Sequence, residues 1–543
     1  MRLPDSLRYT NAILDPVHGI VRLSNEERAV LNHPLFQRLH HIRQNGLLYY
    51  VFPAASHTRF EHSLGVLHIA QTIVESLLRN GYAASKKGRA RSVGEAAEGE
   101  AVALHTLDEE VLTALIRVVR FAGLVHDLGH GPLSHTFDSF APKTGPVIEI
   151  VRTDERLASV RGLAENIGQS DDPNKADRPR VEHEEMSCIL FAVIWDQLLK
   201  DGEVATNATG VDAQHVPGVV AAAILQRPEL CLSEGLKRYV PLLHDLIASA
   251  PLDADRMDYL ERDSRSIGVT YGLYDRERVL RSLLVCTSHD STTLRLAVKR
   301  SGIRAVENFV QARFQLFTQV YYHKTNRATS AMLEAIAKQA GDELDLFTPS
   351  TLDDLVETYL ELSDETFIRV LKGDETVSKD LRDIARKISR RQLWKRVDEV
   401  TQVDVSDDVE VILKKAEDSE GTPPARGEKP TDRKAATQKA VKQRLEKHRR
   451  QLVAAHPDAS LHLDTVDPKA TKDIDRKDVA RILHRGSDGV YGLVLGRSWA
   501  DELPTLRVLA QEEVSIGRLY YSGDDETTLK ALRAAALTLD DPQ

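Results

Sequence analysis

Apolar residues recur every three or four positions over long stretches of the first two thirds of the chain. The stretches HSLGVLHIAQTIVESLL, which starts at His62, and VLTALIRVVRFAGLVHDLGH, which ends at His130, show this spacing clearly. Such spacing is typical of helices that bury one face. Further helices are predicted for EEMSCILFAVIWDQLLKDG, PLLHDLIASAPLDADRMDYLERDSRSIG and GIRAVENFVQARFQLFTQVYYHKTNRATSAMLEAIAKQ. The pattern therefore predicts a mainly α fold.

Four changes of pattern divide the chain. The charged stretch AASKKGRARSVGEAAEGE predicts an exposed loop, and a second excursion, starting ERLASVRG, leads up to His183. Adjacent prolines, glycines and charges predict a linker over 416–434. Beyond it, YGLVLG and LRVLA predict strands. We expect a helical core over 1–340, a helical extension over 341–415, the linker, and a C-terminal α+β lobe over 435–543.

The composition excludes several classes of protein. The 543 residues are 42% hydrophobic and 28% charged, which are ordinary values for a folded protein. The chain has no signal-peptide pattern, no apolar run long enough to span a membrane and no CxxC pair, so we expect a cytoplasmic protein without membrane partners. A net charge of −10 opposes nonspecific attraction to nucleic acid or anionic lipid. Any anionic ligand must therefore find a local positive pocket.

Histidines are concentrated early in the chain, since 11 of the 20 lie at or before His135. The segment HDLGHGPLSHTFD holds His126, Asp127, His130, His135 and Asp138 at the end of an apolar helix. A helix through this segment would place His126 and His130 on one face. Imidazole and carboxylate groups are common ligands of divalent metals, whereas the lack of thiolates disfavours a structural zinc site.

An isolated His-Asp pair is more often a helix end than a metal site. Here two distant segments add the same chemistry, because HTRFEHSLG contains His62 and LDADRMDYLERD contains Asp255, each within a helical pattern. We therefore predict that His62, His126, Asp127 and Asp255 form one divalent-metal site.

Several motifs resemble those of the HD-domain metal-dependent phosphohydrolases, and within them the deoxynucleoside triphosphate triphosphohydrolases. They are DPVHGIVRL, HPLFQRLHHIRQNGLLYYVFPAASHTRFEHSLGV, HDLGHGPLSH, DADRMDYLERD and ARFQLFTQVYYHK, in the family's order over roughly the first 325 residues. The resemblance implies a helical HD-domain core. It also implies that the same four side chains bind a catalytic divalent metal, with manganese, magnesium, iron or zinc compatible with them.

The resemblance also implies roles for residues around the metal. His130, His135 and His183 match histidines beside the phosphates. We favour His183 as the donor of a proton to the leaving 5′ oxygen, with His130 at the α-phosphate and Asp138 orienting a histidine, although these roles could permute. For His135 and Asp138, a supporting or helix-capping role is an equal alternative.

The residues that match the family's substrate contacts form a second set. Arginine forks suit phosphate oxygens, a tyrosine packed against C2′ would exclude ribose, and an amide can read the 3′ hydroxyl. The set consists of Gln44, Arg59, Arg256, Tyr259, Asp263, Arg313, Tyr321 and Lys324.

The chain departs from the family at three positions. Asn32 and His40 replace an acid and an arginine that read a guanine effector in the family, and Asn45 replaces an apolar residue beside the sugar.

The predicted activity is hydrolysis of deoxynucleoside triphosphates to deoxynucleoside and triphosphate by a homo-oligomer, in nucleotide-pool control or phage defence. An alternative is an HD-type nuclease or nucleic-acid-binding protein that uses the segment from Arg433 to Arg450, which has eight basic residues and one acid. The same segment also fits a solvated helix paired with acids, since aromatic stacking partners are absent from it. A third interpretation is a regulatory module that keeps the metal site without turnover.

Overall fold

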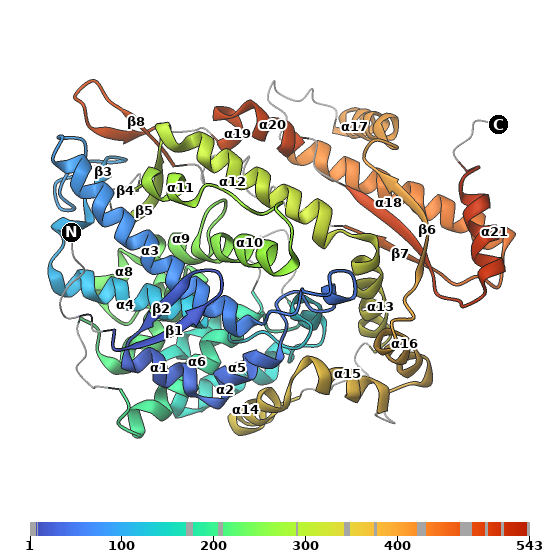
Figure 1. Ribbon diagram of the computed structural model, residues 1–543, viewed down its shortest axis with the longest axis horizontal. Coiled ribbons are helices and arrows are strands. Elements are labelled where there is room, and N and C mark those ends of the chain that lie inside the picture. Colours follow the sequence, from blue (N-terminus) through green and yellow to red (C-terminus); the bar gives the residue numbers. More distant parts are fainter. Residues whose placement is uncertain are drawn as a thin grey trace. The chain divides into compact units, whose positions relative to one another are not determined.

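The computed structural model describes residues 7, 9–169, 178–204, 210–288, 292–340, 348–373, 377–420, 430–466, 481–494, 498–511 and 515–539 (Figure 1). Helices dominate, so the predicted mainly α fold is confirmed. The chain divides into two compact units. Unit 1 comprises 1–312, 342–370 and 480–496, and unit 2 comprises 313–341, 371–479 and 497–543. Among the described residues, no helix is long and apolar enough to cross a membrane.

Unit 1 is built around helix α3, Arg59–Ser85, which packs against α4, Glu109–Val125, and α10, Ala254–Ile267. α3 begins sharply because Glu61 accepts hydrogen bonds from the backbone N–H and the hydroxyl of Thr58. The other helices of this unit are α1 Asn25–Asn32, α2 Pro34–Gln37, α5 Thr144–Thr153, α6 His183–Lys200, α7 Val216–Leu225, α8 Glu234–Lys237, α9 Val240–Ala248, α11 Arg276–Ser282 and α14 Leu352–Glu361. Helices α12 Ile303–Leu316 and α15 Asp364–Gly373 begin in this unit.

Two small sheets accompany these helices. β1 Asn11–Asp15 and β2 Gly19–Leu23 form an antiparallel hairpin. A five-stranded sheet has the order β3 Ala101–Val102, β4 Leu283–Thr287, β5 Leu294–Lys299, β8 Ile482–Arg485 and β9 Tyr491–Leu493. The stretch 83–100, which we predicted as an exposed loop, is only partly exposed, because Ala84 and Ala90 are buried in the core beside β3, β4 and β8. The prediction failed because the charged residues around them concealed the two alanines that the fold buries.

Two local predictions about helices and strands are wrong. α4 ends at Val125, so His126 and His130 do not lie on one helical face but in the turns that follow it. LRVLA is not a strand, because it lies within the helix α20, Pro504–Gln511. The short apolar run fits the periodicity of a strand and that of a helix. The preceding proline, at the first helical position, favours the start of a helix.

Unit 2 contains a three-stranded antiparallel sheet with β10 Ile516–Tyr521 between β6 Lys395–Thr401 and β7 Leu461–Thr465. Helix α18, Pro430–Ala455, packs on this sheet through apolar residues such as Val441 and Leu445. The remaining helices are α13 Lys324–Ala340, α16 Lys379–Ser389, α17 Ser406–Glu420, α19 Trp499–Glu502 and α21 Glu526–Ala536. Residues 421–429 of the predicted linker lie outside the described residues, and the predicted domain boundaries stay predictions.

Asp245 on α9 ties β8 to the rest of unit 1. Its carboxylate is 1% exposed and accepts two hydrogen bonds of 2.8 Å from Arg295, one of 3.0 Å from the backbone N–H of Leu296 and one of 3.1 Å from Arg481. These bonds and the two guanidinium groups hold the pKa of this carboxyl below its usual value, although burial opposes the charged form. The ion pairs connect residues far apart in the sequence.

We expect Asp245→Asn to lower the free energy of unfolding by about 3 kcal/mol, because it removes an anionic partner of the partly buried guanidinium groups of Arg295 and Arg481. Thermal unfolding followed by circular dichroism measures the change. Glu234→Gln is the control, because it removes an exposed pair with Lys237 that contributes about 1 kcal/mol or less. Equal melting temperatures for the two variants would contradict a stabilising role for Asp245.

Candidate functional site

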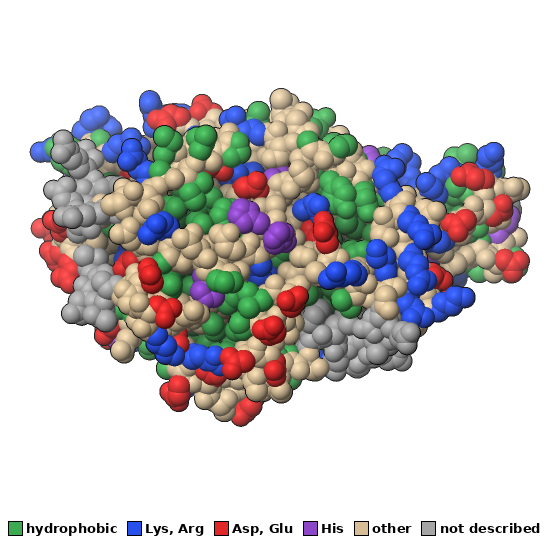
Figure 2. Space-filling model, turned by 60° about the horizontal axis from the view of Figure 1, so that its bottom comes forward, with side chains coloured by type: hydrophobic (Ala, Val, Ile, Leu, Met, Phe, Trp, Pro, Cys, Tyr) green, Lys and Arg blue, Asp and Glu red, His purple; other side chains and the backbone are tan. Residues whose placement is uncertain are grey.

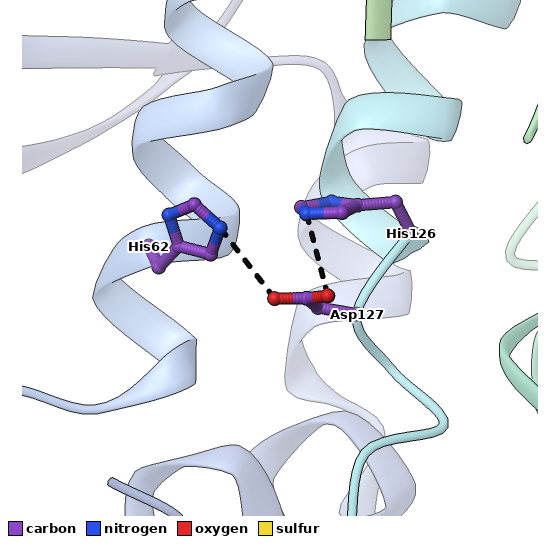
Figure 3. A group of neighbouring side chains, drawn as sticks. All are labelled: His62, His126 and Asp127. Atoms are coloured by element: carbon purple, nitrogen blue, oxygen red, sulfur yellow. Dashed lines mark ion pairs between the residues drawn. The ribbon is translucent and has the colours of Figure 1, made fainter. Parts of the chain in front are cut away.

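Three helices of unit 1 bring together the four predicted metal ligands. His62 lies in the first turn of α3, His126 and Asp127 directly follow α4, and Asp255 lies in the first turn of α10. Ligand atoms of His62, His126 and Asp127 all lie within 4.8 Å of one another, and these side chains point toward one another (Figure 3). Segments far apart in the sequence therefore bring these side chains into one cluster, and their role as metal ligands stays a prediction.

The distances fit a divalent cation. Nε2 of His62 lies 3.5 Å from Asp127 and 3.1 Å from Asp255, and Nε2 of His126 lies 3.5 Å from Asp127 and 3.9 Å from Asp255. Both Nε2 atoms are buried without a hydrogen-bond partner in the described structure. Two imidazole nitrogens and two carboxylates at these distances form a donor set that suits manganese, iron, magnesium or zinc.

The electrostatics of the cluster favour positive charge. Burial opposes protonation of His62, but the nearby carboxylates of Asp255 and Asp258 outweigh it and raise the pKa of His62 to about 10. Burial also opposes ionisation of Asp127, yet Arg59, His126 and His130 hold the pKa of this carboxyl well below its usual value. Asp127 is therefore an anion at neutral pH, and the cluster can attract a metal ion.

Both the imidazole ring and the backbone carbonyl of His126 are held by hydrogen bonds. Its Nδ1 lies 2.9 Å from the carbonyl of Gly123, which directs Nε2 toward the cluster. The hydroxyl of Ser187 donates to the His126 carbonyl at 2.7 Å and accepts from the N–H of Gly129 at 2.7 Å. A Cβ on Gly129 would lie 2.2 Å from the carbonyl oxygen of His183. Glycine is therefore required for the turn to lie against the start of α6.

His62 is oriented by the buried carboxylate of Asp258, one helical turn after Asp255. Nδ1 of His62 lies 2.7 Å from Asp258, so Nε2 is left for the cluster. Asp258 also contacts His18 at 2.5 Å and Arg262 at 2.8 Å. A Cβ on Gly65 would lie 1.8 Å from the Asp258 carboxylate, so glycine permits this close approach. A carboxylate behind a histidine ligand fixes its tautomer and increases its basicity.

A second group extends from Asp127 to His130 and His183. Ligand atoms of these three residues also lie within 4.8 Å of one another. The rings of His130 and His183 stack with their centroids 3.7 Å apart, and Nδ1 of His183 lies 3.2 Å from Glu184 and 4.0 Å from Asp138. Burial, Arg59 and His183 lower the pKa of His130 well below its usual value. His130 is thus neutral at pH 7. Figure 2 shows histidine side chains gathered near the middle of one face.

The predicted phosphate contacts Arg59 and Arg256 both lie in elements that carry metal-site residues. Arg59 starts α3, contacts Asp127, and donates to the Ser134 hydroxyl at 3.1 Å and 2.8 Å. Arg256 follows Asp255 and pairs with Asp253 at the start of α10. Both guanidinium groups are in unit 1.

Three predicted sugar contacts are also in unit 1. Asp263 is buried and accepts hydrogen bonds from Asn45 at 2.9 Å and pairs with His57 at 2.7 Å. The side-chain oxygen of Gln44 is buried and has no hydrogen-bond partner in the described structure, as suits a group that receives a ligand. Tyr259 is partly buried on α10.

Arg313, Tyr321 and Lys324 belong to unit 2, and their roles at the substrate stay predictions. Lys324 lines a cavity of about 600 Å³ within that unit. Basic and aromatic side chains share this lining, namely Arg391, Trp394, Lys395, Arg396, Tyr520 and Arg533. The side chain of His135 lies outside the described residues, so its predicted role is not placed by the structure.

Sequence analysis missed the residues that orient the ligands. Asp258 had a signal, since it lies three residues after Asp255 on a predicted helix and so shares its face. His18 lies in the motif DPVHGIVRL, but the motif alone does not indicate its partner. Ser187 had no signal, because its partners are distant in the sequence and serine is a common residue.

The basic segment of α18 is partly neutralised within unit 2. Arg433 lies 2.9 Å from Glu410, Arg444 lies 3.5 Å from Asp408, and Arg449 lies 2.7 Å from Glu446. These pairs favour a solvated helix over a surface for nucleic acid. Nucleic-acid binding by this segment stays a prediction.

Comparison with known proteins supports the resemblance. A family model described as HD associated region matches residues 274–422. The human deoxynucleoside triphosphate triphosphohydrolase SAMHD1 is 27% identical over 405 residues, which cover 73% of this chain and 55% of that protein. The uncharacterized protein YwfO of Bacillus subtilis is 28% identical over 400 residues, which cover 71% of each chain. The chain thus spans about half the length of the human relative.

A solved structure shares the fold. The crystal structure of a hypothetical protein from Aquifex aeolicus aligns with a TM-score of 0.59 and 21% sequence identity. The alignment covers 97% of this chain and 99% of that one. This likeness extends over both units.

We expect Asp258→Asn to weaken binding of Mn²⁺ by about 10- to 100-fold, because His62 loses the carboxylate that fixes its tautomer. Titration of the metal-free protein with Mn²⁺, followed by electron paramagnetic resonance, measures the affinity. Glu277→Gln, which changes an exposed side chain of α11, is the control and should bind Mn²⁺ like the original protein. An unchanged affinity in a folded Asp258→Asn variant would contradict the orienting role.

Proposed function

We propose that this chain, which is similar in sequence to a deoxynucleoside triphosphate triphosphohydrolase, belongs to the HD-domain phosphohydrolases and is a divalent-metal-dependent hydrolase of deoxynucleoside triphosphates. The products would be a deoxynucleoside and inorganic triphosphate. The observation that carries the proposal is the convergence of His62, His126, Asp127 and Asp255, with two further histidines sharing Asp127.

His62, His126, Asp127 and Asp255 would hold the metal. A bound divalent ion supplies Lewis acidity toward a phosphoryl oxygen and makes nearby water more acidic. The protein contributes the orientation of the ligands, through the contacts of His62 with Asp258 and of His126 with Gly123. Burial of these contacts excludes competing water from the ligand atoms.

Proton transfer is assigned to the stacked histidines. Water adds to the α-phosphorus, the bond from phosphorus to the 5′ oxygen breaks, and the 5′ oxygen takes a proton. His183 suits the donor because its ring stacks on His130 and its Nδ1 lies 3.2 Å from Glu184, which can orient the ring. Neutral His130, with its lowered pKa, suits a hydrogen bond to the α-phosphate rather than proton donation.

The triphosphate would be bound by guanidinium groups. Arg59 and Arg256 each pair with a carboxylate in the protein alone, with Asp127 and Asp253 respectively. Phosphate oxygens can take over hydrogen bonds of these planar donors because the fork geometry matches both anions. Arg313 and Lys324 would add positive charge, and Gln44, Asp263, Tyr259 and Tyr321 would contact the nucleoside. We also propose a homo-oligomer, with a role in nucleotide-pool control or phage defence.

The test is product analysis of the full chain with Mn²⁺, Mg²⁺ or Fe²⁺ and each deoxynucleoside triphosphate, alone and in mixtures. We expect deoxynucleoside and intact triphosphate, with ¹⁸O from labelled water in the triphosphate and not in the 5′ hydroxyl. His126→Ala should abolish both turnover and metal retention. Release of pyrophosphate and nucleotide would contradict the proposal, and cleavage of single-stranded DNA with untouched triphosphates would favour the nuclease alternative.

We expect His183→Gln to lower kcat by about 100- to 10,000-fold, because an amide cannot donate a proton to the leaving oxygen. Metal content should stay unchanged, since His183 is not among the four proposed ligands. Steady-state kinetics and mass spectrometry of the bound metal measure the two quantities. Near-normal kcat in this variant would assign proton donation to another group.

A further inference from the structure

A loop with an unusual backbone conformation follows the segment that carries His126, Asp127 and His130. Leu133 and Ser134, which follow the segment HDLGHGP, have φ angles of 59° and 57°. Residues with a side chain rarely adopt this left-handed region, and they persist there only where the surroundings hold them. Among the described residues, no other non-glycine pair of neighbours has positive φ angles.

The carboxylate of Asp364 holds this loop. One oxygen accepts a hydrogen bond of 2.7 Å from the N–H of Leu133, and the other accepts one of 3.1 Å from the N–H of Arg43. The guanidinium group of Arg43 lies 3.5 Å from the same carboxylate. Asp364 is 3% exposed and starts α15, more than two hundred residues after the loop. One buried carboxylate thus connects two loops of unit 1.

The two loops also contact each other. The φ of Gly46 is 52°, and a Cβ there would lie 3.1 Å from the Leu133 carbonyl oxygen. The hydroxyl of Ser134 lies 2.8 Å from the Gln44 carbonyl and 3.0 Å from the Arg43 carbonyl. The backbone that carries Gln44 is therefore fixed relative to the backbone that carries Ser134.

The fixed hydroxyl in turn holds Arg59. Nε and Nη2 of Arg59 donate to the Ser134 hydroxyl, while Nη1 contacts Asp127. The orientation of this guanidinium group therefore depends on the left-handed backbone at Ser134. Without the anchor at Leu133, that backbone would relax toward a commoner conformation and the hydroxyl would move.

We propose that Asp364 is a positioning residue for triphosphate binding, which acts through Leu133 and Ser134 on Arg59 and through Arg43 on Gln44. The proposal rests on the proposed function, since Arg59 and Gln44 are its phosphate and sugar contacts. Asp364 itself does not contact the four proposed metal ligands. Its described partners are the Leu133 N–H and the N–H and guanidinium group of Arg43. Its carboxylate would therefore set the geometry for the substrate without changing metal affinity.

The test compares Asp364→Asn with Glu365→Gln, an exposed neighbour in the same helical turn. Asparagine keeps the size but places an amide where one N–H needs an acceptor. Calorimetry of the Mn²⁺-loaded full chain with inorganic triphosphate should show about 10- to 100-fold weaker binding for Asp364→Asn only. Mn²⁺ affinity should stay within about twofold, because no proposed ligand contacts Asp364. A merely structural defect would lower both affinities together.

Hydrogen exchange tests the anchor independently of any activity. Amide exchange of peptides that contain Leu133 and Arg43 should speed up by about tenfold or more in Asp364→Asn and stay unchanged in Glu365→Gln. If exchange speeds up in this way while the original protein binds no triphosphate, the proposed function is wrong. The role of Asp364 in holding the two loops is then still supported. Unchanged exchange at both loops, or unchanged triphosphate affinity in a protein that binds it, overturns the inference.

Two further variants keep the test decisive. Ser134→Ala should weaken triphosphate binding to a similar extent, and the double variant with Asp364→Asn should bind no more weakly than the worse single variant, because both act on Arg59. Additive losses would overturn the connection between the two residues. If Asp364→Asn does not fold, Asp364→Glu keeps the charge, displaces the oxygens by one carbon and is judged by the same criteria.

Discussion

The compensation of buried negative charge around Asp127 is the constraint on which the rest of the site depends. Its side chain is 7% exposed, and a carboxylate removed from water needs several partners to stay ionised. Arg59, His62, His126 and His130 surround it and supply positive or polar groups. Asp258 repeats the arrangement behind His62, where Arg262 and His18 balance it. The buried carboxylate of Asp127 thus stays ionised and can bind a cation.

Precision in this site comes from segments that do not take part in chemistry. Ser187 on α6 fixes the turn after α4, Asp258 on α10 fixes His62 on α3, and Asp364 on α15 fixes the loop at Leu133. Each contact uses a backbone group or a ring nitrogen, which leaves the ligand side chain little freedom to rotate. A site that must place several charges within a few ångströms gains from such rigid support.

The helices and the four candidate ligands could be predicted because their signals are local and repeated, and the role of the four side chains as ligands stays a prediction. The long apolar periodicity predicted α3 and α4. Histidine and aspartate residues within helical patterns pointed to His62, Asp127 and Asp255 as candidate ligands. The end of α4 could not be predicted, because the apolar pattern continues through Leu128 while the backbone already turns at His126. Asp364 could not be found either, since its function depends on two backbone N–H groups that leave no mark in the sequence.

The strand order of the five-stranded sheet has a consequence for how the chain matures on the ribosome. β5 pairs in parallel with β8, and β8 pairs antiparallel with β9, so strands near residue 490 complete a sheet that starts at Ala101. Until synthesis reaches them, β5 presents an open edge of unpaired backbone groups, which can pair with a wrong segment or another nascent chain. Unit 1 therefore reaches its final fold only after β8 and β9 have been synthesised.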